Sequence, residues 1–413
     1  MDIHILFALV ICFAAVMYTI FDGFDLGVGI LFPFIKNESS RDTMVDSITP
    51  VWDGNETWLI LLGVGLFGGF PKAYSILLPA LYLPLIVMVI GLILRGVAME
   101  FRFVSVHRKS WWDAAFSFGS VMAVFCQGLV LGNLMEGIKV YKDIAYRDIT
   151  FNFLSPFTIL IGLVLIVTYA LIGATWLNFK TSGKLQATFK RFVKRIIFCL
   201  LLLLILVVFG RFYLEIFIPR FGAFGIGRIL SLPSIVWYIA TVILTAAIYF
   251  TVDRKNDILP FVLNILMTTG SALYIVSGFW PYIVPPDLTI FDAGSPAYGN
   301  RILLICSLVI VPIILAYFIY SYIVFKGKVS GKDNYEPSLA ESELLKSKVK
   351  VNGNDHAGFK VLTMAWPWRI AISLGGIFFF FVVLGFFGDL TAQLAIAVFI
   401  VIFLAACFKY QRI

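Results

Sequence analysis

Residues 4–31 read HILFALVICFAAVMYTIFDGFDLGVGIL, an apolar run that is long enough to cross a membrane and that carries two carboxylates. About 20 residues span the hydrocarbon as a helix. Asp22 and Asp25 lie three positions apart, so a helix places both on one face. Charged groups are costly in hydrocarbon, and an intramembrane carboxylate indicates a functional site. The pair predicts a site that handles protons, or holds a polar ligand, near one side of a membrane.

The composition of the whole chain also indicates a membrane protein. Of its 413 residues, 61% are hydrophobic and 14% are charged, and the mean hydropathy is +0.96. Soluble domains carry about 25% charged residues, so we predict an all-α polytopic membrane protein. The net charge of +8 is interpreted as loop charge that sets topology, and not as the mark of a nucleic-acid partner.

Apolar stretches long enough to span recur along the chain, and lipid requires them to be helical. The body, residues 1–325, is predicted to hold nine, near 4–31, 56–71, 75–95, 114–135, 156–178, 195–217, 233–252, 257–280 and 302–325. Residues 326–366 are polar and rich in Gly, Ser, Lys and Glu, which predicts a flexible linker. Residues 367–413 contain two further stretches, near 369–387 and 390–408, which predict a C-terminal transmembrane hairpin.

Lys and Arg are unequally distributed between the loops. Loops 1, 3, 5 and 7, counted from the N-terminus, and segment 326–366 are richer in these residues than the even loops. The positive-inside rule therefore predicts that these segments are cytoplasmic and that the N-terminus lies outside.

A second acidic cluster lies at the cytoplasmic start of the second stretch, in VWDGNETW, with Asp53 and Glu56. The third stretch ends in LILRGVAMEFR, with Arg95 and Glu100. Three helix ends are thus predicted to bring five acids and one arginine to one depth, where Arg95 tunes the charge of a proton path. An ordinary alternative is that Glu56 and Glu100 only extend into the membrane interface.

Tryptophans flank the second cluster. Trp52 and Trp58 could stack on a quinone ring, but an aromatic belt at the membrane interface is the favoured interpretation. Asn55 and Glu56 lie between them and are further candidates for a quinone or interface contact. The G-x-x-x-G pairs Gly23/Gly27 and Gly65/Gly69 predict close helix packing.

Metal and haem ligation have weak support in the sequence. The five cysteines fall in apolar stretches without a C-x-x-C, which argues against a zinc or iron–sulfur site. None of the three histidines, His4, His107 and His356, lies in the middle of a predicted helix, so an axial haem ligand is not expected on this chain.

At these residues the sequence resembles subunit II of cytochrome bd-type quinol oxidase. The matching segments include DGFDLGVG (Asp22–Gly29), ITPVWDGNETWLI (Ile48–Ile60), RGVAMEFR (Arg95–Arg102) and LTIFDAGS (Leu288–Ser295), in family order. The resemblance covers residues 1–330. Residues 326–413 depart from the usual pattern, because the family body ends near residue 330.

The resemblance implies a subunit of a quinol:oxygen oxidoreductase in a prokaryotic cytoplasmic (inner) membrane. It implies two four-helix bundles plus a peripheral helix, and a partner, subunit I, that carries haem b and haem d-type groups. Family proton paths draw on acids of subunit II, which points to Asp22, Asp25, Asp53 and Glu100, whereas Glu56 is variable. Some relatives hold a structural quinone in this subunit. The extra hairpin could stand in for a small single-helix accessory subunit.

A proton-coupled transporter or channel is the rival interpretation. Transporters of that class have internal repeats and ion sites near the middle of the membrane. Here the acids gather at one side and no tight repeat is visible.

Overall fold

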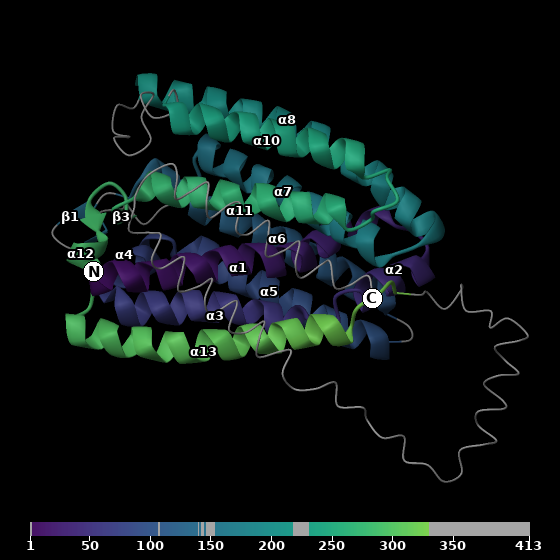
Figure 1. Ribbon diagram of the computed structural model, residues 1–413, viewed down its shortest axis with the longest axis horizontal. Helices are drawn as coiled ribbons and strands as arrows, with labels where there is room; N and C mark the ends of the chain where they lie inside the picture. The colour runs from purple at the N-terminus through teal and green to yellow at the C-terminus, as the bar shows by residue number, and fades with distance from the viewer. Residues whose placement is uncertain are drawn as a thin grey trace, which may run out of the picture.

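The computed structural model describes residues 2–105, 108–138, 140–141, 144–145, 153–217 and 231–329. Long helices run side by side along the longest axis of the molecule (Figure 1). The described residues contain eight helices long and apolar enough to span a membrane, or nine if one bent pair counts as a single span. The predicted all-α polytopic fold is confirmed. The linker from residue 330 onward and the C-terminal hairpin lie outside the described residues.

The first half of the chain forms the helices that carry the carboxylates. They are α1 (Ile3–Leu31), a 3-10 turn (Phe32–Phe34), α2 (Glu38–Asp46), α3 (Trp52–Gly69), α4 (Pro71–Ala80), α5 (Tyr82–Val104) and α6 (Lys109–Glu136). A small antiparallel pair, β1 (Val140–Tyr141) and β2 (Ile144–Ala145), follows α6.

The second half begins with α7 (Pro156–Lys180), α8 (Gly183–Phe217), α10 (Leu232–Thr251) and α11 (Leu259–Phe279). A second antiparallel pair, β3 (Tyr282–Val284) and β4 (Leu288–Thr289), leads through α12 (Ile290–Ala293) to α13 (Ala297–Val324). The N-terminus, β3 and α12 lie at one end of the molecule and α2 lies at the other (Figure 1).

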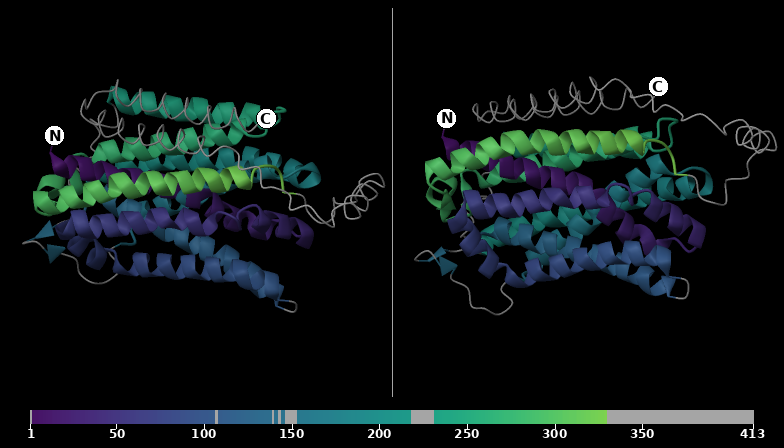
Figure 2. Two further views of the ribbon diagram at one scale, coloured as in Figure 1. Left: turned by 60° about the horizontal axis from the view of Figure 1, so that its bottom comes forward. Right: turned by 90° about the horizontal axis from the view of Figure 1, so that it is seen from below.

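Helix contacts divide the body into two groups of four long helices. In the first group α3 and α6 pack on α1, and α5 packs on α6. In the second, α8 and α11 pack on α7, and α10 packs on both α8 and α11. The groups meet where α1 and α6 contact α7, while α13 packs on α1 and α3 at the side. Both views in Figure 2 show α13 beside α1.

One span differs from the sequence prediction. The stretch predicted near 75–95 is interrupted at Leu81, which separates α4 from α5. Helix α4 also forms a bent pair with α3, with a bend of 120° between the two helices. Prolines explain the breaks, because Pro71 starts α4 and Pro84 lies in the first turn of α5, where a missing N–H is tolerated. Helix α5 then continues to Val104, past the charged residues at which hydropathy ends the stretch.

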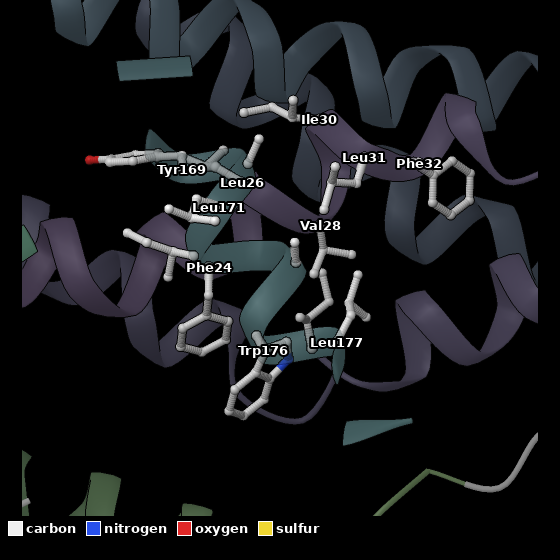
Figure 3. Close-up of a cluster of buried hydrophobic side chains, with 14 of the residues drawn as sticks. Phe24, Leu26, Val28, Ile30, Leu31, Phe32, Tyr169, Leu171, Trp176 and Leu177 are labelled. Carbon is white, nitrogen blue, oxygen red and sulfur yellow. The ribbon is translucent and has the colours of Figure 1, made fainter. Parts of the chain in front are cut away.

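The two groups of helices meet at a pair of glycines. A Cβ atom on Gly27 of α1 would lie 2.0 Å from the Tyr169 carbonyl oxygen, and one on Gly173 of α7 would lie 2.4 Å from the Gly27 carbonyl carbon. The helices therefore touch backbone to backbone. Next to this crossing, the Phe24 and Trp176 rings stack with centroids 4.3 Å apart (Figure 3). The close packing predicted for the Gly23/Gly27 pair is confirmed at Gly27, and it fixes the segment of α1 that carries the carboxylates.

Candidate functional site

A cluster of polar side chains lies inside the first group of helices, toward the end that holds α2. Helix α1 contributes Asp22 and Asp25, α3 contributes Asn55 and Glu56, and α5 contributes Arg95. Asp22, Asp25, Asn55 and Arg95 have no exposed surface, and the Glu56 side chain is 27% exposed. Glu56 is therefore the group through which the cluster reaches the surface of the chain.

Arg95 pairs with carboxylates from two different helices. Its Nη2 donates to Asp22 Oδ1 at 2.7 Å and to Glu56 Oε1. The guanidinium also lies over the Trp52 ring, 5.6 Å from its centroid. Arg95 thus ties α5 to α1 and α3 inside the protein, where breaking a buried ion pair leaves an uncompensated charge.

Asp25 has a different environment from Asp22. Asn55 Nδ2 donates to Asp25 Oδ2 at 2.7 Å and also to the Phe21 carbonyl at 3.3 Å. The Tyr322 hydroxyl of α13 donates to Asn55 Oδ1 at 3.1 Å. Within the described residues, Asp25 Oδ1 has no hydrogen-bond partner. A neutral amide is therefore the direct partner of this buried carboxyl group.

The cluster has more acidic than basic groups. One guanidinium faces three carboxyl groups, and two of them occupy the same Nη2. Arg95 Nε and Nη1 make no hydrogen bond to any described residue. Because one cation balances one anion, the site can hold protons on its remaining carboxyl groups.

Two predicted site residues lie outside this buried cluster. Asp53 and Glu100 are exposed, on α3 and α5 respectively. Asp53 continues an exposed stripe of α3 that includes Ile60, Val64 and Phe67. Helices α3 and α5 pack against each other close to Asp53 and Glu100, since a Cβ on Gly96 of α5 would lie 3.1 Å from the Trp52 ring of α3.

The tryptophans differ in position. Trp58 is fully buried, and its ring packs on Phe13 and Phe318 with centroids 5.7 and 5.6 Å away. The Trp58 ring thus lies in the apolar core of this chain, and its predicted quinone or interface contact stays a prediction. Trp52 is partly exposed beside Arg95 and Asp53, so the quinone or interface prediction stays open for it.

A second charged network lies two turns beyond Arg95 on α5, at the α2 end. Arg102, which lies beyond the apolar stretch predicted near 75–95, is fully buried at the end of α5. Its Nε donates to Asp113 of α6 at 2.6 Å and its Nη1 to Asp42 of α2 at 2.5 Å. Arg41 Nη1 donates to Asp113 at 2.8 Å. These pairs fasten α2 across the helix ends.

Sequence reasoning missed three polar neighbours of the carboxylates. Tyr18 lies beside Asp22, one helical turn earlier, and Gln127 of α6 donates to its hydroxyl at 2.6 Å. The i−4 spacing from Asp22 was a usable signal for Tyr18. Tyr322 carried no signal, because a tyrosine near the end of an apolar helix is common at membrane interfaces.

The fold and the site define a class: a multi-pass, all-α membrane protein with an Arg–carboxylate cluster buried between its spans. Within that class the chain belongs to a known family. The family model described as cytochrome bd terminal oxidase subunit II matches residues 3–325, and this confirms the resemblance that the motifs indicated.

Relatives match over most of their length. The chain is 26% identical over 348 residues to cytochrome bd ubiquinol oxidase subunit 2 of Bacillus subtilis (strain 168), covering 80% of this chain and 98% of that protein. It is 27% identical over 356 residues to cytochrome bd-I ubiquinol oxidase subunit 2 of Escherichia coli (strain K12), covering 76% and 92%.

A solved structure shares the fold. A chain of the bd oxidase from Geobacillus thermodenitrificans superposes with a TM-score of 0.62 and 18% identity, covering 79% of this chain and 100% of that chain. By its family model the chain belongs to the subunit II family of cytochrome bd-type terminal oxidases, and membership of that family implies a subunit I partner.

Proposed function

We propose that this chain is the haem-free subunit of a quinol:oxygen oxidoreductase and supplies part of its cytoplasmic proton path. Quinol oxidation releases protons and electrons, and the reduction of oxygen to water consumes both. If the two half-reactions exchange protons with opposite sides of the membrane, charge is separated without a pump. The role of the chain is to deliver protons toward subunit I and to pack against it.

The observation that carries this proposal is the position of Asp25. A carboxylate without a cationic partner is strongly disfavoured in a buried site, and Asp25 is fully buried with an amide as its hydrogen-bond donor. Binding a proton removes the unpaired charge, and releasing it restores the charge. Asp25 therefore has the environment of a group that alternates between two protonation states, and Arg95 sets the charge of the neighbouring carboxyl groups.

Protons need an entry and an exit. Glu56 joins the buried cluster to the surface, and Asp53 and Glu100 lie on the exposed faces of the neighbouring helices. We assign Asp22, Asp25 and Glu56 to the buried part of the path. Asp53 and Glu100 belong to its outer part, where subunit I would cover them.

The redox groups belong to the partner in this proposal. Haem b and haem d-type groups require axial ligands such as histidine. Among the described residues the one histidine is His4, at the far end of α1 from the carboxylates, and its Nδ1 is hydrogen-bonded to Asn300 Nδ2 at 2.9 Å. That geometry suits a structural contact between α1 and α13. We also propose that a structural quinone binds beside Trp52 of this chain.

Orientation follows from loop charge. We propose that the α2 end, with Arg41, Arg102 and Lys109, is cytoplasmic and that the N-terminus lies outside. Loops 1, 3, 5 and 7 and segment 326–366 are then cytoplasmic. The buried carboxyl groups lie nearer the cytoplasmic end of α1 than its start, as an uptake path from that side requires.

The C-terminal region is proposed to be separable from the body. The family match ends at residue 325, and residues 326–366 have the composition of a linker. Residues 367–413 would then be an added hairpin that packs on a lipid-exposed face, where some oxidases carry a small single-helix subunit.

Purification of an affinity-tagged chain tests the oxidase assignment against the transporter alternative. We expect a haem-bearing partner, a visible haem spectrum and quinol-driven oxygen consumption, while the chain expressed alone should bind no haem. A chain truncated after residue 330 should still assemble. A pure, haem-free homo-oligomer that transports protons would contradict the assignment.

A further inference from the structure

The hydrogen bond between Tyr322 and Asn55 joins the peripheral helix to the carboxylate site. Tyr322 lies near the C-terminal end of α13, and its hydroxyl donates to Asn55 Oδ1 at 3.1 Å. The other end of the same amide donates to Asp25 at 2.7 Å. Asn55 is therefore held from both sides, and the position of Tyr322 affects how it presents its amide to Asp25.

The chemistry of the three groups fixes the orientation of the Asn55 amide. Its NH₂ group faces two acceptors, the Asp25 carboxyl and the Phe21 carbonyl, and its oxygen faces the hydroxyl donor of Tyr322. An amide does not exchange protons readily along such a chain. Tyr322 thus acts on Asp25 through geometry, as a positioning residue, and lies off the route of the proton itself.

A buried lysine fixes the end of α13. Lys180, the last residue of α7, is 6% exposed. Its Nζ donates to the Phe325 carbonyl at 2.9 Å and to the Gly327 carbonyl at 3.3 Å, where the chain leaves α13. A cation at a helix C-terminus satisfies carbonyl groups that lack helical partners. The Val329 N–H donates back to the Lys180 carbonyl at 2.8 Å, which closes the contact from both chains.

Aromatic rings fill the space between Lys180 and the site. Lys180 Nζ lies 5.1 Å from the centroid of the Trp176 ring. Trp176 stacks on Phe24, the residue before Asp25, and its ring centroid is 6.4 Å from that of Tyr322 (Figure 3 shows the Phe24–Trp176 pair). A shift of the end of α13 would therefore be felt at Tyr322 and at the backbone next to Asp25.

A second ion pair lies at the same end of α13. Lys328 Nζ is 2.7 Å from Asp257 Oδ2, in the loop between α10 and α11. Burial acts to raise the pKa of Asp257, but Lys328, Gln186 and Lys190 outweigh it and hold that pKa below its usual value. The start of the segment that follows α13 is thus attached to the second group of helices at two points.

We propose that Lys180 and Tyr322 are positioning residues for Asp25, with Lys180 clamping the end of α13 so that Tyr322 holds Asn55 against the carboxyl group. This inference rests on the proposed proton path and adds residues to it that lie on α7 and α13. It also gives the segment leaving α13 a physical connection to the site, because that segment contains the carbonyl groups that Lys180 binds.

Tyr322→Phe in the assembled complex is the first test, with Tyr320→Phe as the matched control. Tyr320 lies on the same helix and is 55% exposed. Losing one neutral hydrogen bond corresponds to about a fivefold decrease in turnover if the bond is fully used in proton transfer. Because a donor to the Asp25 carboxyl is loosened, the pH profile of turnover should also move to higher pH. Tyr320→Phe should leave both unchanged.

The same change in an Asp25→Asn background separates the two proposals. We expect Asp25→Asn alone to slow turnover, and adding Tyr322→Phe to it to have no further effect. An equal slowing by Tyr322→Phe in both backgrounds, or none in the Asp25 background, would overturn the positioning role. If Asp25→Asn itself keeps normal turnover, the proton path fails and the inference fails with it.

Lys180 is tested by Lys180→Met and Lys180→Arg, with Lys184→Met on an exposed position as the control. We expect Lys180→Met to reproduce the pH shift of Tyr322→Phe and the two changes together to give one shift. Lys180→Arg keeps the donors to the carbonyl groups and should restore the wild-type profile. A wild-type pH profile in Lys180→Met, or additive shifts in the double variant, would show that Lys180 does not act through Tyr322.

Discussion

Arg95 is the residue on which the charge of the buried site depends. Its Nη2 is shared between Asp22 and Glu56, and its ring neighbour Trp52 restricts where the guanidinium can move. Two helices would be left with uncompensated carboxylates if this cation were removed. The site is thus organised by one cation on α5, and its carboxyl groups differ in environment because they differ in their access to that cation.

Replacing Arg95 by Gln should strongly reduce the stability of the complex. Removing one partner of a buried ion pair costs about 3–5 kcal/mol, so we expect a large fall in assembled complex and in its unfolding temperature. Haem content per milligram of membrane protein measures the amount of assembled complex. A double variant, Arg95→Gln with Asp22→Asn, removes both charges and should recover part of the loss. A single variant as stable as the wild type would contradict the pairing.

The sequence predicts the members of this site better than their roles. The i, i+3 spacing of Asp22 and Asp25 and the motif with Arg95 identified three buried groups. The exposure of Glu100 and the partial burial of Glu56 could not be predicted, because side-chain direction depends on how α3 and α5 rotate against their neighbours. Tyr322 was out of reach for the same reason, since its contact joins residues that are 267 positions apart.

At the scale of helices, the crossing of α1 and α7 sets the geometry of the carboxylates. Gly27 lies one turn or less from Asp25 and Phe24, and its helix touches the backbone of α7 at Gly173. The G-x-x-x-G spacing predicted a close contact but not its partner helix. The bend between α3 and α4 was missed because hydropathy measures apolar length and is insensitive to direction, whereas prolines determine where these helices begin.

Gly27→Ala should prevent normal assembly, although alanine is the better helix former. The added Cβ would lie 2.0 Å from the Tyr169 oxygen, which is backbone and cannot turn away as a side chain can. Gly63→Ala on α3 is the matched control, because nothing lies within 4 Å of a Cβ there. That variant should be neutral or stabilised by about 1 kcal/mol. Comparable yields of the two variants, measured as haem-containing complex, would argue against backbone contact at the crossing.

At the scale of the whole molecule, the polar groups divide between two ends with different tasks. One end holds the buried carboxyl groups, the Arg102 network with α2, and the hydrogen bonds from Lys180 to the end of α13. The other holds β3, α12 and the His4–Asn300 contact (Figure 1). Apolar surface faces outward along the long helices, as lipid and a partner subunit require. This difference between the two ends is consistent with proton uptake from one side of the membrane.

The most direct test of the proton path is quinol-driven oxygen consumption by the assembled Asp25→Asn complex. Rates are normalised to haem content and measured across pH, with Asp253→Asn, an exposed aspartate in a loop, as the control. Asparagine keeps the size of Asp25 and its hydrogen bonding but cannot titrate. We expect slow turnover and a flattened pH profile with an unchanged haem spectrum, because we propose that the haems lie on subunit I. Wild-type rates at every pH in Asp25→Asn would contradict the account, since Asp25 would then be a structural residue only.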